Sequence, residues 1–342
     1  MLSVLLSGLV WASGPPPPVV GGEATDRFDA VGAFVASQGD LWGTFCSGTL
    51  IADSQVLTAA HCVDAMVDYN RAGYNISFAT GSDLYDENAV ESITTVSSAI
   101  THPDYAYDPV LRSDIAMARL AEMPGGVDPL PLNDIGPGQR DWSFDTLTHV
   151  GWGALEVEGS GAGVKRMVDL ELADYDDDFV YTWDSEGSNV CVGDSGGPAL
   201  GKRSDGKWAI AGVIAFVFDP EGGEPVCEGG AAGSTRVDAH SDFIEEVLAM
   251  DAPDETLGWS NFELDGSAGN GNLADDASKA GCAVVSAGSV LGGWSVGAVA
   301  VLARRRKWSG HGVRSSSWLA GCGERWHIRR HSGPGTSRLG QN

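Results

Sequence analysis

From Val19 to about Met250 the chain is a series of short apolar segments separated by turns rich in Gly, Asp and Pro. Segments of this length, bounded by turn formers, are typical of β-strands. The first convincing helical pattern is Ser241–Met250, where Phe243, Ile244, Val247 and Leu248 share one face. We therefore expect a large all-β domain or a pair of barrels, ending in one helix. The clearest strand candidates are Ala30–Ser37, Gly48–Ala52, Ser92–Ile100, Thr146–Gly151 and Trp208–Val217.

The N-terminal segment has a different composition. Residues 1–12 are apolar and end in small residues, as a secretory signal does, and the stretch is too short to anchor a protein in a bilayer. Residues 14–18 (GPPPP) form a stiff, extended spacer. We expect residues 1–18 to be a signal-like segment followed by a short Pro-rich pro-segment.

Beyond Met250 the composition changes twice. Residues 251–281 are acidic and rich in Gly, Ser and Asp with little to bury, so we expect a linker. Residues 283–303 carry no charge and are followed at once by Arg304–Lys307, which predicts a transmembrane-like segment with a basic stop at 282–307. A buried core helix is the alternative, but a Gly-rich stretch after a linker has no core to join. We expect residues 308–342 to be an unstructured basic tail.

The charge of the chain excludes one class of partner. The sequence has 47 Asp and Glu against 21 Lys and Arg, and nine of these basic residues lie within residues 304–342. Nucleic-acid binding requires clustered cations that contact the phosphates. The acidic body therefore argues against a nucleic-acid partner, and we interpret the acidity as a contribution to solubility.

Neither the cysteines nor the histidines form a metal-binding pattern. No two cysteines form a CxxC pair, so a zinc site or a thioredoxin-like motif has no support. An even number of widely spaced cysteines fits disulfides in an oxidising compartment. His102, His149 and His240 lack metal-ligand spacing, and the acidic stretch Asp83–Glu87 is expected to be a solvated loop rather than a calcium site. We expect neither a metal nor a cofactor. The six cysteines are Cys46, Cys62, Cys191, Cys227, Cys282 and Cys322.

Three short segments carry residues suited to nucleophilic catalysis. They are Leu57–Cys62 (LTAAHC), Asp114–Leu120 (DIAMARL) and Gly193–Pro198 (GDSGGP). A serine hydroxyl becomes a useful nucleophile when a histidine accepts its proton, and an acid holds that histidine in one tautomer. The candidates are His61 as base, Asp114 as orienting acid and Ser195 as nucleophile, with the N–H groups of Gly193 and Ser195 as oxyanion hole.

The same three segments resemble the TAAHC, DIAL and GDSGGP signatures of the chymotrypsin/trypsin-like serine peptidases, in that family's chain order. The resemblance covers about residues 19–250. It implies two six-stranded antiparallel barrels with a C-terminal helix, an active site between the barrels, and hydrolysis of peptide bonds through an acyl-enzyme. Further matches are Val19–Gly22 (VVGG), Cys46–Ile51 (CSGTLI), His102–Tyr105 (HPDY) and Gly151–Gly153 (GWG).

The resemblance also implies three residue pairs. Cys46 would bond to Cys62, and Cys191 to Cys227. In the family a new α-amino group at the mature start pairs with the aspartate before the nucleophile, which implies an activation pair between Val19 and Asp194 and a zymogen before cleavage. Pro18 precedes Val19, so activation by a trypsin-like cleavage is not expected.

The substrate pocket departs from that of trypsin. Asn189 stands where trypsin-like members carry an aspartate, so the pocket lacks a partner for Arg or Lys. Val217 replaces a wall glycine on the strand that includes Ala215 and Phe216, and Ala232 replaces another. We expect a preference for small or medium uncharged residues at P1, the position before the scissile bond.

Location and oligomeric state complete the expectations. Cys282, the apolar span and the arginines resemble the C-terminal sorting tails of myxobacterial surface proteins, which implies a secreted or cell-surface, outer-envelope protein tethered through its tail. We expect a monomer that acts on proteins or peptides. The alternatives are a catalytically silent homologue that only binds partners, and a lipase or esterase. A lipase or esterase would need a GxSxG elbow between a strand and a helix together with the chain order Ser, Asp, His, which this sequence lacks.

Overall fold

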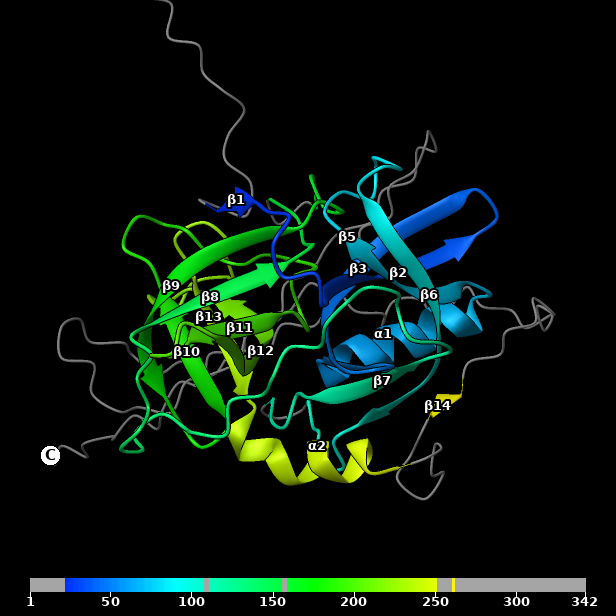
Figure 1. Cartoon of the computed structure of the whole chain (residues 1–342). Helices are drawn as coiled ribbons and strands as arrows, with labels where there is room; N and C mark the ends of the chain where they lie inside the picture. Colours follow the sequence, from blue (N-terminus) through cyan, green and yellow to red (C-terminus); the bar gives the residue numbers. More distant parts are fainter. Residues whose placement is uncertain (1–21, 108–110, 156–158, 251–259, 262–342) are drawn as a thin grey trace, which may run out of the picture.

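Two antiparallel β-barrels lie side by side in the computed structural model, which describes residues 22–107, 111–155, 159–250 and 260–261 (Figure 1). In the first barrel the strand order is β6-β5-β2-β3-β4-β7, and pairing of β6 with β7 closes it. In the second the order is β9-β10-β13-β12-β11-β8, and pairing of β8 with β9 closes it. All of these pairings are antiparallel, which confirms the expected pair of six-stranded barrels.

The bounds of the strands follow the turn residues of the sequence. The first barrel consists of β2 (Val31–Gln38), β3 (Leu41–Ala52), β4 (Gln55–Thr58), β5 (Asn75–Gly81), β6 (Val90–Thr101) and β7 (Ala116–Leu120). The second consists of β8 (Thr146–Gly151), β9 (Arg166–Tyr175), β10 (Phe179–Trp183), β11 (Pro198–Lys202), β12 (Trp208–Phe218) and β13 (Ala231–Arg236). Two short strands add to the edges, β1 (Glu23–Ala24) on β9 and β14 (Ser260–Asn261) on β6.

Each barrel encloses side chains from the inward faces of its strands. Phe34, Leu50 and Phe78 are fully buried in the first barrel, and the rings of Phe34 and Phe78 lie 5.2 Å apart. Leu147 and Val180 are fully buried in the second barrel. These apolar interiors hold the strand ends and loops between the barrels in place, and those loops carry the candidate catalytic residues.

The helix α1 (Ala60–Arg71) contradicts the expectation that no helix precedes Ser241. Its buried residues all lie between Ala60 and Met66, and its last four residues, Asp68–Arg71, include no aliphatic side chain, so no sustained helical period is visible in the sequence. Ala59 occupies the N-cap position and makes no side-chain capping bond, which removes the usual start signal. Packing against the barrel therefore determines this helix.

The expected C-terminal helix is present as α2 (Ser241–Leu248), preceded by a 3₁₀ turn at Asp238–His240. Phe243, Ile244 and Val247 are buried, whereas Leu248 is exposed. Among the residues that the structure describes, no helix combines the length and the apolar character needed to cross a membrane. The segments expected at 1–18, 282–307 and 308–342 lie outside the described residues, and so does the linker expected at 251–281 apart from residues 260–261.

Candidate active site

His61 and Asp114 are brought together by the pairing of two strands. His61 is the second residue of α1, which follows β4, and Asp114 lies just before β7. β4 pairs with β7 along its length, so both residues lie at the same end of the strand pair. The imidazole Nδ1 lies 2.7 Å from Asp114 Oδ2, and the His61 backbone N–H donates to Oδ1 at 2.9 Å.

This geometry determines the tautomer of His61. Asp114 is fully buried, while the His61 side chain is 15% exposed. A carboxylate only accepts hydrogen bonds, so Nδ1 carries the ring proton and donates a hydrogen bond to Asp114. Nε2 of the neutral ring is then left as an acceptor, which is the form that a general base requires.

Asp114 is also held from the second barrel. Its carbonyl oxygen accepts a hydrogen bond from the Thr235 hydroxyl at 2.9 Å. The preceding residue, Ser113, has a φ of 47°, a left-handed conformation that is uncommon for serine. Its N–H donates to Asp178 Oδ2 at 2.7 Å, and His240 Nε2 lies 2.7 Å from Asp178 Oδ1. Sequence reasoning missed these supporting residues because no local motif marks them.

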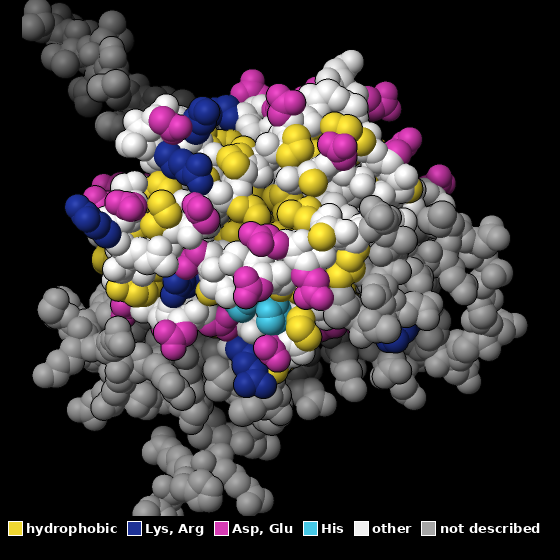
Figure 2. Space-filling view, turned by 60° about the horizontal axis from the view of Figure 1, so that its bottom comes forward, with side chains coloured by type: hydrophobic (Ala, Val, Ile, Leu, Met, Phe, Trp, Pro, Cys, Tyr) yellow, Lys and Arg dark blue, Asp and Glu magenta, His cyan; other side chains and the backbone are white. Residues whose placement is uncertain are grey.

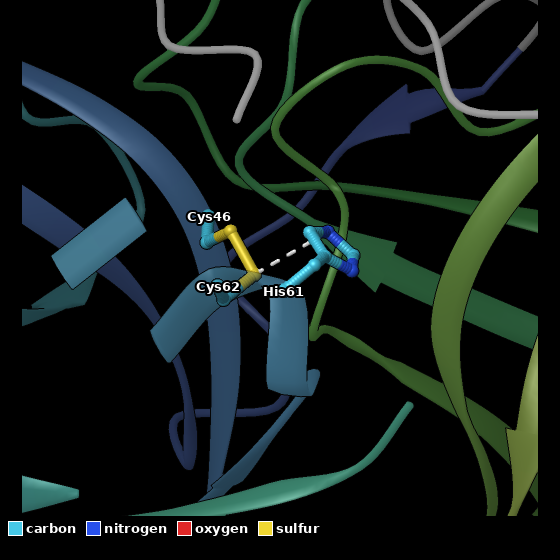
Figure 3. Close-up of side chains that lie close together, drawn as sticks. All are labelled: Cys46, His61 and Cys62. Carbon is cyan, nitrogen blue, oxygen red and sulfur yellow. Dashed lines mark hydrogen bonds between the residues drawn. A yellow bond between two sulfur atoms is a disulfide. The ribbon is translucent and has the colours of Figure 1, made fainter. Parts of the chain in front are cut away.

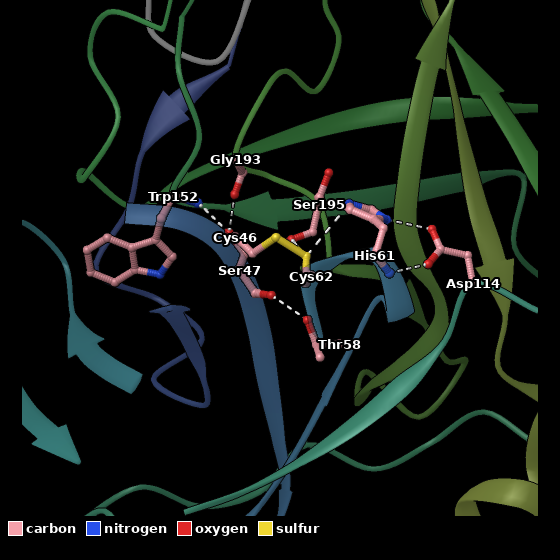
Figure 4. The surroundings of a disulfide bond; sticks show 9 residues. All are labelled: Cys46, Ser47, Thr58, His61, Cys62, Asp114, Trp152, Gly193 and Ser195. Atoms are coloured by element: carbon pink, nitrogen blue, oxygen red, sulfur yellow. Dashed lines mark hydrogen bonds and ion pairs between the residues drawn. A yellow bond between two sulfur atoms is a disulfide. The ribbon is translucent and has the colours of Figure 1, made fainter. Parts of the chain in front are cut away.

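Ser195 lies in a loop held by both barrels. Its carbonyl oxygen accepts the N–H of Ser47, on β3, at 2.8 Å, and the N–H of Gly196 donates to the carbonyl of Ile214, on β12, at 2.7 Å. Cys62 Sγ lies 3.5 Å from the Ser195 carbonyl oxygen and 3.7 Å from His61 Nε2. Figure 4 shows Ser195 beside the imidazole, on the side away from Asp114.

The loop before Ser195 has a fixed backbone direction at Gly193. The carbonyl of Val192 accepts the N–H of Ala154 at 2.7 Å. Because a trans peptide is planar, the Gly193 N–H of the same peptide must face away from Ala154. Gly193 has a φ of 92°, which favours glycine at this position.

Ser47 is a further residue that the sequence analysis did not single out. Its hydroxyl donates to the Gly193 carbonyl at 2.9 Å and accepts the N–H of Trp152 at 3.0 Å. It is fully buried, and its own carbonyl accepts the Thr58 hydroxyl at 2.9 Å. The serine directly after Cys46 was the available signal, but its role depends on contacts more than 100 positions away in the chain.

Asp194 is a buried carboxylate at the base of this loop. Oδ1 accepts the N–H of Gly153 and Oδ2 accepts that of Cys191, both at 2.8 Å. Burial raises the pKa of Asp194 to about 6, although the two N–H donors and the nearby positive charge of Arg166 pull it down. Val19, the expected partner of Asp194, lies outside the described residues.

The raised pKa predicts a pH-dependent stability of the full chain. Folded Asp194 binds its proton more tightly than unfolded Asp194, whose pKa is the ordinary 3.8. Its contribution to the free energy of unfolding therefore falls as the pH rises from about 4 to above 6, by about 3 kcal/mol for two pKa units. Denaturant unfolding of the full chain and of its Asp194→Asn variant at pH 4 and pH 7 measures this difference. Equal pH dependence of the two proteins would contradict it.

Both expected disulfides are present. Cys46 on β3 bonds to Cys62 on α1, and Cys191 bonds to Cys227. The first lies directly beside the His61 ring (Figure 3). Its two sulfurs are bonded to each other and offer no thiolate, so this Cys–His–Cys group is not a metal site by its donor set. Cross-links of this kind each add about 2–4 kcal/mol to stability.

The residues expected to line the pocket fall into two groups. Val217 pairs with Ala232 across β12 and β13, and both pack in one apolar cluster with Val190. Ala215 and Phe216 belong to a separate cluster with Leu111, Phe179 and Tyr181.

Asn189 is fully buried, and its Oδ1 accepts the N–H of Val190 at 2.9 Å. Its Nδ2 has no hydrogen-bond partner among the described residues.

The other histidines of the described residues have structural partners. His149 is buried, its ring nitrogens lie 3.2 Å from the Leu147 carbonyl and 3.3 Å from the Thr182 hydroxyl, and burial lowers its pKa to about 4. His102 packs edge-on against His240 at 4.8 Å between ring centroids. Neither His102, His149 nor His240 belongs to a cluster of potential metal ligands within the described part of the chain.

Comparison with known proteins places this architecture in a family. The Trypsin family model matches residues 19–244. A venom serine protease of Polistes dominula is 28% identical over 227 residues, covering 60% of this chain and 76% of that protein. An ovochymase of Halocynthia roretzi is 31% identical over 201 residues, covering 52% of this chain but 12% of that protein. Phenoloxidase-activating factor 3 of Holotrichia diomphalia is 28% identical over 268 residues, covering 68% and 73%. The chain therefore belongs to the trypsin family of serine proteases.

Proposed function

We propose that the protein is an extracellular serine endopeptidase that cleaves proteins or peptides through an acyl-enzyme formed on Ser195. The observation that carries the proposal is the pair of hydrogen bonds between His61 and the buried carboxylate of Asp114. They hold the imidazole with Nε2 free of that carboxylate, and Ser195 lies beside the ring. The name of the venom relative agrees with an extracellular location.

The chemistry follows from the roles of these groups. Ser195 Oγ attacks the scissile carbonyl while His61 Nε2 accepts its proton, and Asp114 stabilises the imidazolium that forms. The N–H groups of Gly193 and Ser195 bind the developing oxyanion. His61 then gives the proton to the leaving amine, and water hydrolyses the acyl-enzyme by the same steps in reverse order.

Within this proposal, the pocket prefers small or medium uncharged P1 residues. A fully buried amide at Asn189 supplies no negative charge for Arg or Lys. The Val217 side chain packs against Val190 and Ala232, which removes room that a glycine would leave. Ala, Val, Thr and Leu are therefore the expected P1 residues, with graded preferences.

Replacement of Val217 by glycine is expected to widen the pocket. The variant should raise kcat/KM for a Phe substrate about 10- to 100-fold relative to the Ala substrate, since each methylene in such a pocket changes binding by about 1–3 kcal/mol. Val217→Ala is the graded control and should fall between the two proteins. Matched peptide substrates that differ at P1 provide the measurement. A wild-type preference for Phe or Tyr would contradict this role of Val217, and a preference for Arg or Lys would contradict that of Asn189.

We also propose that the mature enzyme begins at Val19 and that its α-amino group pairs with Asp194. The burial of Asp194 supports this, because a buried carboxylate gains from a positive partner. The tail from Cys282 onward is proposed to tether the enzyme to the cell surface. The acidic surface, with Asp and Glu spread over the face in Figure 2, agrees with peptide rather than nucleic-acid substrates.

A further inference from the structure

Arg166 is a buried cation beside the loop of residues 191–195, which we call the oxyanion loop because it carries the N–H groups of Gly193 and Ser195. It is the first residue of β9, and the residue is 5% exposed. Its Nη1 donates to the carbonyls of Gly161 at 2.6 Å, Val164 at 3.2 Å and Gly153 at 3.4 Å. Within the described part of the chain no carboxylate lies within ion-pair distance of it. A buried guanidinium without a close counter-ion is costly, so its presence needs an explanation.

Gly153 connects this cation to Asp194. Its carbonyl accepts from Arg166, and its N–H donates to Asp194 Oδ1. Asp194 packs directly against the backbone of the turn at residues 151–154, because a Cβ added at Gly151 or Gly153 would collide with it. Two buried charges of opposite sign therefore lie on either side of one glycine. Arg166 is also the charged side chain that favours ionised Asp194, and Asp194 is the first of the acidic groups that favour charged Arg166.

We propose that Arg166 is a positioning residue that supplies the buried positive charge for Asp194 while Val19 is still joined to Pro18. The Asp194 carboxylate then keeps its hydrogen bonds to Gly153 and Cys191, and the loop to Ser195 stays ordered before cleavage. The unprocessed chain retains part of the activity as a result. The proposal rests on the proposed function and concerns the regulation of that same site.

Two further observations favour this arrangement. Pro18, rather than Arg or Lys, precedes Val19, so a trypsin-like activator has no matching cleavage site there, and activity before processing would not depend on such an enzyme. The turn that Arg166 contacts is fastened at successive residues, because Trp152 donates to Ser47, Gly153 to Asp194, and Ala154 to the Val192 carbonyl.

The neighbouring Lys165 provides a matched control. It is also buried, at 1% exposure, but its ammonium donates to the Phe28 carbonyl at 3.3 Å. The acidic side chains that act on it are Asp29, Glu91 and Asp26, and Asp194 is not among them. Replacing Lys165 thus removes a buried charge next to Arg166 without removing the one that acts on Asp194.

The test compares two forms of the chain, one beginning at Gly14 and one at a free Val19, both ending at Asn342. Wild type, Arg166→Gln, Arg166→Lys and Lys165→Gln are made in each form. For each protein, kcat and KM are measured on one peptide substrate, together with the Kd of a peptide boronic acid, which occupies the oxyanion hole, and with Tm. The pH dependence of kcat/KM gives an independent readout of the ionisation of Asp194.

Wild type beginning at Gly14 is expected to have a kcat about 10- to 100-fold below that of the Val19 form. In the Gly14 form, Arg166→Gln should lower kcat and boronate affinity by a further factor of about ten or more, with little change in KM. The acid limb of the pH profile of kcat/KM for this variant should move to higher pH, because loss of the cation raises the pKa of Asp194. In the Val19 form the loss should be at least about tenfold smaller, since the α-amino group supplies the charge. Arg166→Lys should recover most of the activity of the Gly14 form.

Three outcomes would overturn the proposal. The first is that Arg166→Gln lowers kcat by the same factor in both forms. The second is that it does not change kcat of the Gly14 form. The third is that Lys165→Gln lowers kcat as much as Arg166→Gln does, with the same difference between the two forms. Equal losses accompanied by a lower Tm would assign Arg166 a purely structural role. An inactive wild type beginning at Val19 would instead contradict the proposed function itself, which keeps the two failures distinguishable.

Discussion

Replacement of Ser195 or His61 by alanine is expected to lower kcat by about 10⁴- to 10⁶-fold while leaving the fold intact. Ser195→Ala removes the attacking oxygen. The hydrogen bonds that hold the loop, from the Ser47 N–H to the Ser195 carbonyl and from the Gly196 N–H to the Ile214 carbonyl, join backbone atoms and do not involve the side chain. His61→Ala removes the base, but the Cys46–Cys62 disulfide and the buried residues of α1 remain. Hydrolysis of a peptide substrate measures the loss, and an unchanged Tm shows that folding is preserved.

Asp114→Asn tests the orientation of the imidazole separately. An amide nitrogen facing Nδ1 would donate to it, which shifts the His61 proton to Nε2 and removes the acceptor that Ser195 needs. A loss of about 10⁴-fold in kcat is expected from such a tautomer change in enzymes of this type. Two outcomes would contradict these predictions. Wild-type-like turnover by a folded Ser195→Ala variant would show that Ser195 is not the nucleophile. Failure of the wild type to react with a fluorophosphonate would favour the catalytically silent alternative.

Replacement of Gly196 by alanine is expected to reduce activity by at least about 10²-fold and stability by a few kcal/mol. Gly196 has a φ of 83°, and a Cβ there would collide with the Thr58 hydroxyl and with the Ser47 carbonyl, which is backbone of β3. The loop would have to move away from β3, which breaks the hydrogen bond from the Ser47 N–H to the Ser195 carbonyl. A displacement of about 1 Å at a catalytic group costs about 10²-fold in rate.

Gly206 offers a matched control for this variant. It also has a φ of 83°, but nothing lies within 4 Å of a Cβ added there. Gly206→Ala thus isolates the cost of the left-handed backbone, about 1–2 kcal/mol, from the cost of the collision. Urea unfolding and kcat of both variants give the comparison. If Gly196→Ala were no worse than Gly206→Ala, the tight contact between this loop and β3 would not be what positions Ser195.

The two barrels could be predicted because both the strand pattern and the family motifs are local in sequence. Thr146–Gly151 was predicted with the bounds that β8 has, and Trp208–Val217 ends one residue before β12 does. The expected strand Gly48–Ala52 covers less than half of β3, because Leu41–Ser47 lacks a regular alternation and becomes a strand by pairing with β2. The helix α1 was missed for a related reason, since it has neither a capping residue nor a continuous apolar face.

The sequence by itself determined which residue types could do the chemistry, because each motif around His61, Asp114 and Ser195 lies within a few consecutive positions. Only the tertiary structure decided how they are held. The Ser47 hydroxyl, the Thr235 hydroxyl and the carboxylate of Asp178 reach across 65 to 146 positions of chain to the backbone that they hold. The position of Arg166 near Asp194 depends in the same way on how the turn at Gly153 folds over the oxyanion loop. Contacts between residues so far apart leave no periodicity or motif in the sequence, so they become visible when the barrels have closed.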